Sequence, residues 1–298
     1  MFTDVKDTDV YDYRKSKEER YGTYMRELKR KDHSVKKSVR TALGYLDIYI
    51  YYPKELKTNI VYFNSHGGGM CLSNFELDMP YCQKICDAIG CIVVNVDYFV
   101  APEYKFPKTY TSMYEMIKYC NEHRDEFAFG DAKFVIGGNS AGGQISAAVI
   151  QLEKQDHEDF IKGLVLNYAP CDQHIDQTKV IDQQKAISPS RIHQYQAWEY
   201  NDASEIEDPL SSIVNSDPRI YPPTLENTAE LDSLRAGEEQ FAEMLQKQGT
   251  YVDYKCYSGC QHGFTHQELH EYNAEASEDA WERIEAFLKK IAKNEGRK

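Results

Sequence analysis

The sequence has no long run of apolar residues. Its first 22 residues, MFTDVKDTDVYDYRKSKEERYG, lack the apolar core of a secretory signal. No later stretch approaches the roughly 18 consecutive apolar residues that cross a bilayer. We therefore expect no membrane span and a soluble, cytoplasmic protein, whose eight cysteines remain reduced thiols.

Positive charge is also scarce. The 35 Lys and Arg residues are outnumbered by 48 Asp and Glu, for a formal net charge of −13. No basic surplus is left to neutralise phosphates, so we expect no nucleic-acid partner. The first forty residues are the exception, with twelve basic against eight acidic residues. Because these charges are scattered, they indicate the solvated face of a helix, with a basic docking arm as the alternative.

No linker rich in proline, glycine or serine and no internal repeat divides the 298 residues. Apolar, β-rich stretches alternate instead with helical ones. We expect strands at 45–52, 59–65, 91–98, 133–138, 163–170, 223–230 and 251–257. Helices are expected around 76–89, 108–123, 141–154 and 233–248, and at the end of the chain. This alternation predicts an α/β fold with a mostly parallel sheet flanked by helices, and functional groups at the carboxyl ends of its strands.

Two segments interrupt the alternation. Residues 1–44 precede the first expected strand and look helical and polar. A long insertion at 171–221 separates two core strands at the end where functional groups gather, a position typical of a lid or cap. Its aromatic residues Tyr195, Trp198 and Tyr200 could equally pack on the body of the protein, and both roles can hold together.

The stretch GGNSAGG (137–143) joins the strand at 133–138 to the helix at 141–154. A serine on such a corner needs a strained backbone and small residues two positions before and after it, here Gly138 and Gly142. This is the G-x-S-x-G nucleophile elbow, so we expect Ser140 to be a catalytic nucleophile. An ordinary glycine-rich turn is the alternative.

A serine hydroxyl is a weak nucleophile and needs a base, an orienting carboxylate and donors for the oxyanion. The stretch NSHGGGM (64–70) follows the strand at 59–65, and its glycines leave backbone N–H groups accessible. With the amide of Ala141 it predicts an oxyanion hole of the HGGG type. A phosphate-binding loop is less consistent, since neither a following Lys-Ser/Thr nor a G-x-G-x-x-G spacing is present. We expect His66 to brace the loop and Cys71 to line the pocket.

The base and the carboxylate are expected after the last two strands. His262 lies in SGCQHGF (258–264) and Asp232 in TAELDSLR (228–235). The chain order Ser, Asp, His is typical of an α/β hydrolase and differs from those of trypsin-like and subtilisin-like proteases. Glu230 is the alternative carboxylate, although its place at the end of a strand favours a supporting role.

A run of cysteines and histidines between residues 256 and 270 has the spacing of a zinc site: Cys256, Cys260, His262, His266 and His270. Against zinc, Cys256 belongs to a strand, His262 is better used as the base, and no second cluster completes a tetrahedron. We expect no metal and no organic cofactor.

With these motifs in place, the chain from about residue 45 to its end resembles the hormone-sensitive-lipase-like family of α/β-hydrolase esterases. The most specific marks are HGGGM, VDYFVAPEYKFP (96–107), GGNSAGG, AELDSLR and HGF. The resemblance implies a triad of Ser140, Asp232 and His262, and oxyanion donors at Gly68, Gly69 and Ala141. Phe99 and Asn139 stand where the family usually has arginine and aspartate.

The resemblance further implies a helical cap, built from residues 1–44 and about 172–206, on a catalytic domain of residues 45–298. The expected activity is serine carboxylic ester hydrolysis, through an acyl-enzyme, of small or medium acyl esters. An amidase or arylformamidase using the same triad is one alternative. A non-catalytic small-molecule binding protein of the same fold is another. A small-molecule ester is the expected partner, and a homodimer stays open.

Overall fold

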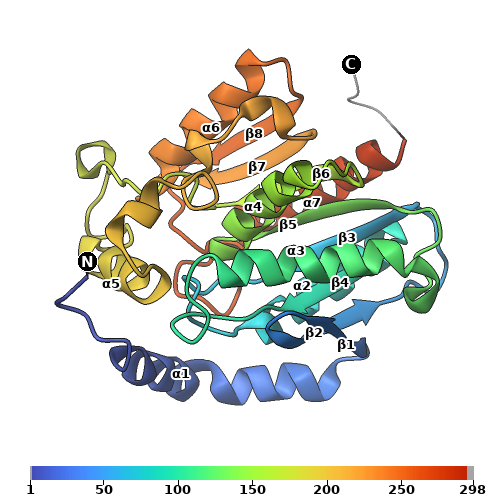
Figure 1. Ribbon diagram of the computed structural model, residues 1–298, viewed down its shortest axis with the longest axis horizontal. Coiled ribbons are helices and arrows are strands. Elements are labelled where there is room, and N and C mark those ends of the chain that lie inside the picture. Colours follow the sequence, from blue (N-terminus) through green and yellow to red (C-terminus); the bar gives the residue numbers. More distant parts are fainter. Residues whose placement is uncertain (1, 294–298) are drawn as a thin grey trace.

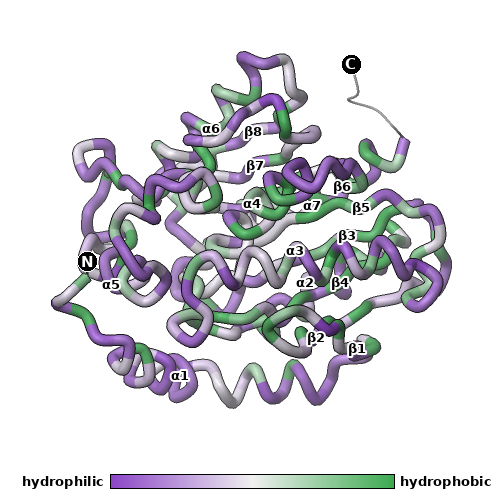
Figure 2. Tube along the Cα trace, in the orientation of Figure 1, coloured by the Kyte–Doolittle hydropathy of each residue, from purple (hydrophilic) through white to green (hydrophobic). Residues whose placement is uncertain are grey.

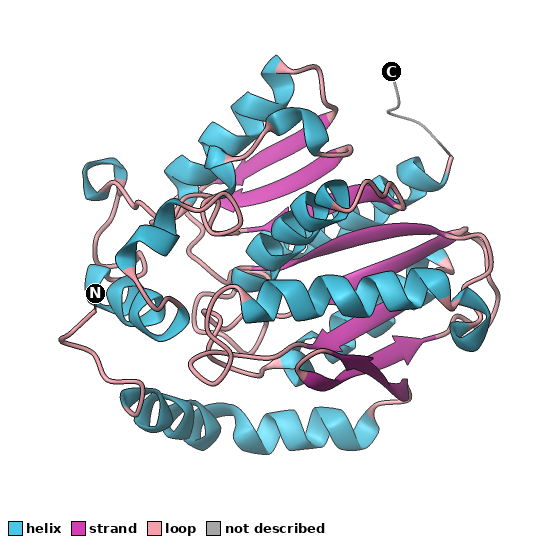
Figure 3. Cartoon of the chain, in the orientation of Figure 1, coloured by secondary structure: helices cyan, strands magenta, loops and turns pink. Residues whose placement is uncertain are grey.

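A mostly parallel sheet forms the centre of the computed structural model, which describes residues 2–293 (Figures 1 and 3). Within that range, eight strands follow the order β1-β2-β4-β3-β5-β6-β7-β8. Their bounds are β1 Val35–Thr41, β2 Gly44–Tyr51, β3 Ile60–Ser65, β4 Ile92–Asp97, β5 Lys133–Asn139, β6 Ile161–Asn167, β7 Thr224–Ala229 and β8 Val252–Tyr257. The β1–β2 and β2–β4 pairs are antiparallel and the remaining pairs are parallel. The α/β fold expected from the alternating pattern is confirmed.

Helices cover both faces of this sheet. They are α1 Asp9–Lys31, α2 Phe75–Ile89, α3 Lys108–Glu122, α4 Ala141–Gln155, α5 Pro189–Glu199, α6 Arg235–Lys247 and α7 Ala274–Ala292. The apolar residues of α3 and α4 belong to one core cluster, and those of α2 and α7 to another. Each helix of residues 2–293 is too short or too polar to span a membrane.

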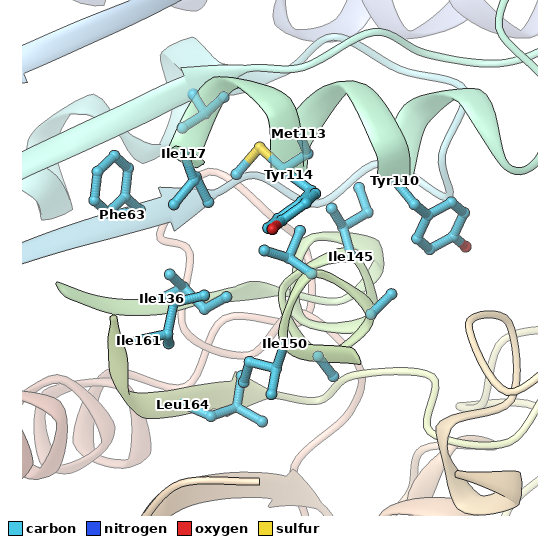
Figure 4. Packing of buried hydrophobic residues seen from close by; sticks show 14 of the residues in the cluster. Phe63, Tyr110, Met113, Tyr114, Ile117, Ile136, Ile145, Ile150, Ile161 and Leu164 are labelled. Carbon is cyan, nitrogen blue, oxygen red and sulfur yellow. The ribbon is translucent and has the colours of Figure 1, made fainter. Parts of the chain in front are cut away.

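The central strands are apolar on both sides because both faces are covered. In β3, Val61 and Phe63 pack into the cluster under α3 and α4, whereas Ile60 and Tyr62 pack under α2 and α7. Figure 4 shows side chains of α3 and α4 meeting in the first cluster. Figure 2 shows apolar residues gathered along the central strands and a largely hydrophilic α1 at the edge.

The sheet begins earlier in the chain than expected. Residues 1–44 contain not only α1 but also β1, which pairs with β2 from Val35 opposite Ile50 to Thr41 opposite Gly44. Only Val39 and Thr41 are buried in β1. An edge strand needs little apolar surface, and charged residues there discourage pairing with other chains. Its sequence, VKKSVRT, therefore has no clear strand pattern.

Glu226 is a fully buried carboxyl group in β7, and its Oε2 has no hydrogen-bond partner among the described residues. Burial raises its pKa well above the ordinary 4.5. The folded protein thus keeps a proton that the unfolded chain releases, and this contribution to stability is lost as pH rises above that ordinary value. We expect Glu226→Gln to raise the free energy of unfolding at pH 8.5 by about 1–3 kcal/mol.

Urea denaturation of the wild type and Glu226→Gln at pH 5.5 and pH 8.5 checks this expectation. The difference in the free energy of unfolding between Glu226→Gln and the wild type should be larger at pH 8.5 than at pH 5.5. Glu243→Gln, at an exposed position on α6, is the matched control and should show no such widening. An equal difference at both pH values would contradict a proton held on Glu226.

Candidate active site

Ser140 occupies the tight turn between β5 and α4. Its backbone has φ 53° and ψ −124°, an unusual conformation for a residue with a side chain. Its N–H donates to the carbonyl of Asn167 at 2.8 Å. A Cβ atom on Gly138 or Gly142 would lie 2.2 or 2.0 Å from the Ser65 carbonyl oxygen. Both glycines are therefore needed because the start of α4 packs directly against the end of β3.

The structure brings Ser140, His262 and Asp232 together. The Ser140 hydroxyl donates to His262 Nε2 at 2.8 Å, and His262 Nδ1–H donates to Asp232 Oδ2 at 2.6 Å. These residues follow β5, β8 and β7, so all three lie at the carboxyl edge of the sheet (Figure 1). The hydrogen-bonded chain can remove the serine proton as the hydroxyl attacks an electrophile.

Buried surroundings fix the orientation of the imidazole. The Asp232 side chain is fully buried, whereas that of His262 is 20% exposed and so faces the pocket. Asp232 Oδ1 also accepts from the Leu234 N–H at 3.1 Å. The ring of Tyr168 packs edge-on against the imidazole, with centroids 5.0 Å apart. Together these contacts hold Nε2 toward Ser140.

Glu230, the alternative carboxylate for the triad, does not bond the imidazole of His262. It accepts from the Gly259 N–H at 2.7 Å and from the Ser258 hydroxyl at 3.0 Å. Glu230 thus holds the turn that precedes His262, and the hydrogen bond to the imidazole comes from Asp232 instead.

The glycine loop after β3 faces the same serine. Gly68 and Gly69 have φ +134° and +57°, and a Cβ on Gly68 would lie 2.8 Å from the Leu72 carbonyl oxygen. Within residues 2–293, their N–H groups donate to no backbone carbonyl. Ala141 begins α4, where an amide has no acceptor within the helix. These three amides are free to bind an oxyanion beside Ser140.

His66 braces the glycine loop, as its place in the motif suggested. Its ring stacks on Tyr98 with centroids 4.0 Å apart, and Nδ1–H donates to the Gly67 carbonyl at 2.7 Å. Burial lowers the pKa of His66, which favours the neutral ring. A neutral, fully buried imidazole holds backbone without competing with His262 as the base.

A cavity of about 320 Å³ opens over Ser140. Its walls come from three parts of the chain: the sheet edge, the inner face of α1, and the inserted segment with α5. The inserted segment contributes mainly apolar side chains, Ile175, Ala186, Ile187, Ile192 and Tyr195. Trp198, by contrast, is almost fully buried and donates to the Lys6 carbonyl at 3.1 Å. The aromatic face of α5 thus serves both the pocket and the packing.

Cys71 is fully buried and is not among the residues that line this cavity, so the expectation that it lines the pocket is wrong. It packs in a small core cluster with Val10, Leu72 and Trp198. Burial raises the pKa of the Cys71 thiol to about 12, which disfavours the reactive thiolate.

A buried ion pair under the elbow was not expected from the sequence. His266 Nε2 donates to Asp78 Oδ1 at 2.7 Å, while Asp78 Oδ2 accepts from Asn64 at 2.7 Å and from Asn139 at 3.0 Å. Burial opposes both charges, but the pairing lowers the pKa of Asp78 and raises that of His266. One feature of the sequence could have indicated this pair: Asp78 lies on the same helical face as the apolar residues Cys82, Ile85 and Ile89, and a carboxylate on a buried face needs a partner.

The cysteines and histidines of residues 256–270 do not converge. Across residues 2–293, no three His, Cys, Asp or Glu side chains are arranged to hold a metal ion. His262 and His266 are instead bonded to two different carboxylates, Asp232 and Asp78.

Comparisons with known proteins extend this description. A family model described as "alpha/beta hydrolase fold" matches residues 60–266. Lipase 2 of Moraxella sp. is 27% identical over 231 residues, 67% of this chain and 53% of that protein. An AB hydrolase superfamily protein of Schizosaccharomyces pombe is 29% identical over 213 residues, 66% of this chain and 61% of that protein. The chain thus spans between half and two thirds of the length of these two relatives.

Solved structures share the same fold. An esterase from the archaeon Pyrobaculum calidifontis superposes with a TM-score of 0.85 at 23% identity, covering 95% of this chain and 94% of that one. A thermostable carboxylesterase from a metagenomic library gives a TM-score of 0.84 at 23% identity, covering 95% and 97%. The family model matches well over half of the residues of this chain. The chain therefore belongs to the hormone-sensitive-lipase-like family of α/β hydrolases.

Proposed function

We propose that this protein is a serine carboxylic ester hydrolase. The observation that carries the proposal is the line of hydrogen bonds from Ser140 through His262 to Asp232, beside the unpaired amides of the glycine loop. A hydroxyl, a base and preorganised donors in one cavity are the parts that acyl transfer requires. The similarity to Lipase 2 of Moraxella sp. supports the same chemistry.

The proposed reaction has two halves. Ser140 Oγ attacks the acyl carbon while His262 Nε2 takes its proton, and the amides of Gly68, Gly69 and Ala141 bind the oxyanion. Asp232 stabilises the imidazolium, which then gives its proton to the departing alcohol and leaves an acyl-serine. Water repeats the sequence with His262 as base, and releases the acid. This chemistry uses the chain's own residues throughout.

We assign the role of a cap to residues 2–31 and 172–206. The support is that α1 and the inserted segment supply most of the outer wall of the cavity. Tyr13 of α1 also bonds Tyr195 of α5 at 2.7 Å between hydroxyl oxygens, which ties the two parts together. Residues 35–41 are left out of this cap because they form β1. A cytoplasmic location and a homodimer stay predictions.

A fluorophosphonate probe tests the nucleophile directly. We expect it to label Ser140 of the wild type, identified by mass spectrometry, and to leave Ser140→Ala unlabelled. Labelling of another residue, or of none, would count against the proposal. Rates on a matched aryl ester and anilide separate esterase from amidase action, and saturable ligand binding without turnover of either would favour a binding protein.

A further inference from the structure

One face of α1 carries positive charge into the cavity above Ser140. Tyr13, Lys17, Arg20 and Tyr21 all line that cavity. They are spaced by four, seven and eight residues from Tyr13, which places them on one side of a helix. Arg191 of α5 is not part of the cavity lining but lies next to it, since its guanidinium is 4.0 Å from the ring centroid of Tyr13. We call Lys17, Arg20 and Arg191 the cationic cluster.

The cationic cluster has no acidic partner. Within residues 2–293, no carboxylate forms an ion pair with Lys17, Arg20 or Arg191. Elsewhere on α1, Arg14 pairs with Glu103 at 2.6 Å and Lys29 with Glu76 at 3.4 Å. Lys15, Arg30 and Lys31, which do not line the cavity, form no ion pair among the described residues. Lys17 and Arg20 differ from the other unpaired basic residues of α1 because they line a cavity, where a ligand can reach them.

Aromatic rings support these cations instead. The Lys17 ammonium lies 5.2 Å from the ring centroid of Tyr13, the Arg20 guanidinium lies 4.9 Å from that of Tyr21, and the Arg191 guanidinium lies 5.7 Å from that of Tyr195. A ring face attracts a cation without occupying its N–H donors. The donors of the cationic cluster therefore remain available to a ligand.

The positive charges of the cluster also act on one another. Burial and the nearby Arg20 and Arg191 lower the pKa of Lys17, an effect that Glu271 partly opposes. Glu271 itself lines the cavity and forms no ion pair among the described residues, whereas the other two acidic groups of the lining are already engaged. Asp78 is paired with His266, and Glu199 is buried, bonded to Tyr110, with a pKa raised by burial to about 7. A bound anion would relieve the repulsion within the cluster.

We propose that the substrate is an ester with a carboxylate or phosphate group, and that the cationic cluster binds this group while Ser140 attacks the ester carbonyl. The proposal rests on the proposed esterase function and adds a substrate class to it. Charge-assisted hydrogen bonds from lysine and arginine suit both anions, and arginine can bind either through two N–H groups. The apolar wall, which includes Leu72, Ile187 and Ile192, would contact the part of the substrate between its two ends.

Pairs of anionic and neutral esters test the proposal and show whether the anionic group lies on the acyl side or the alcohol side of the substrate. On the acyl side, 4-nitrophenyl hydrogen adipate is compared with 4-nitrophenyl methyl adipate. On the alcohol side, 4-acetoxybenzoate and 4-acetoxyphenyl phosphate are each compared with methyl 4-acetoxybenzoate. We expect kcat/KM of at least one anionic ester to exceed that of its neutral partner by about tenfold at low salt, and the ratio to fall as salt is added.

Variants identify the residues responsible. Lys17→Gln/Arg20→Gln should bring the ratio of anionic to neutral kcat/KM close to one. Lys15→Gln, an exposed position on the same helix outside the cavity, is the matched control and should leave the ratio unchanged. Equal or better hydrolysis of the neutral ester in every pair would overturn the anion proposal while leaving the esterase function intact.

A binding measurement keeps the proposal testable without turnover. Calorimetric titration of Ser140→Ala compares three pairs of ligands: monomethyl with dimethyl adipate, 4-hydroxybenzoate with its methyl ester, and phenyl phosphate with phenol. In at least one pair the anionic ligand should bind more tightly than the neutral one. The preference should be lost when Lys17→Gln/Arg20→Gln is added. This result, together with a wild type that hydrolyses no ester, would remove the esterase function but retain the anion site. Equal affinity within every pair would remove the anion site.

Discussion

Ser140→Ala is expected to lower kcat for ester hydrolysis by about 10⁵-fold or more, because the alanine methyl group cannot form the acyl-enzyme. The hydroxyl is placed 2.8 Å from His262 Nε2, so its loss removes the attacking atom and leaves the rest of the cavity unchanged. Residual hydrolysis by water would still benefit from the oxyanion donors. Steady-state rates on a short-chain 4-nitrophenyl ester measure the loss.

The effects of substituting Ser140 and His262 are expected not to add. His262→Ala should cost nearly as much as Ser140→Ala, and the double variant should be no slower than the worse single one, since the two residues act as a unit. Circular dichroism and thermal melting establish that each variant is folded. A Ser140→Ala enzyme that retains more than about a tenth of the activity would show that the nucleophile lies elsewhere.

Asp78→Ala is expected to lower the free energy of unfolding by about 3–5 kcal/mol, because it removes one partner of a buried ion pair. His266, Asn64 and Asn139, all of them buried, would each lose a hydrogen-bond acceptor. Asn139 precedes Ser140, so the turn itself would lose support. Urea denaturation at pH 7 measures the change in stability.

Asp87→Ala is the matched control for this loss, since Asp87 is an exposed residue on the same helix and should change stability by under about 0.5 kcal/mol. Asp78→Asn keeps one acceptor oxygen and similar shape, and should lie between Asp78→Ala and the wild type. An Asp78→Ala protein as stable as the control would mean that the buried network adds nothing to folding.

The central strands and most helices were accessible to sequence reasoning because burial on both faces leaves continuous apolar runs in β3, β4, β5 and β6. The edge strand β1 was missed for the opposite reason. It is charged and buries only two residues, so nothing local distinguishes it from the end of a polar helix.

The buried pair beneath Ser140 shows a second limit. Asp78 and His266 are 188 positions apart, and each has an ordinary local context. His266 even suggested a metal site together with neighbouring cysteines, whereas its actual partner comes from α2. Likewise, the need for glycine at 142 was predicted, but the atom that requires it, the carbonyl oxygen of Ser65, belongs to a different strand.

By itself, the sequence determined the strand-turn-helix that exposes Ser140, the glycine loop after β3, and the order Ser, Asp, His along the chain. These depend on backbone conformation and spacing, which neighbouring residues dictate. Only the tertiary structure decided that Asp232 rather than Glu230 bonds His262, that Asp78 pairs with His266, and that α1 brings unpaired cations to the cavity. Such contacts depend on distances between segments remote in the chain, and those distances exist only once the sheet and its helices have packed.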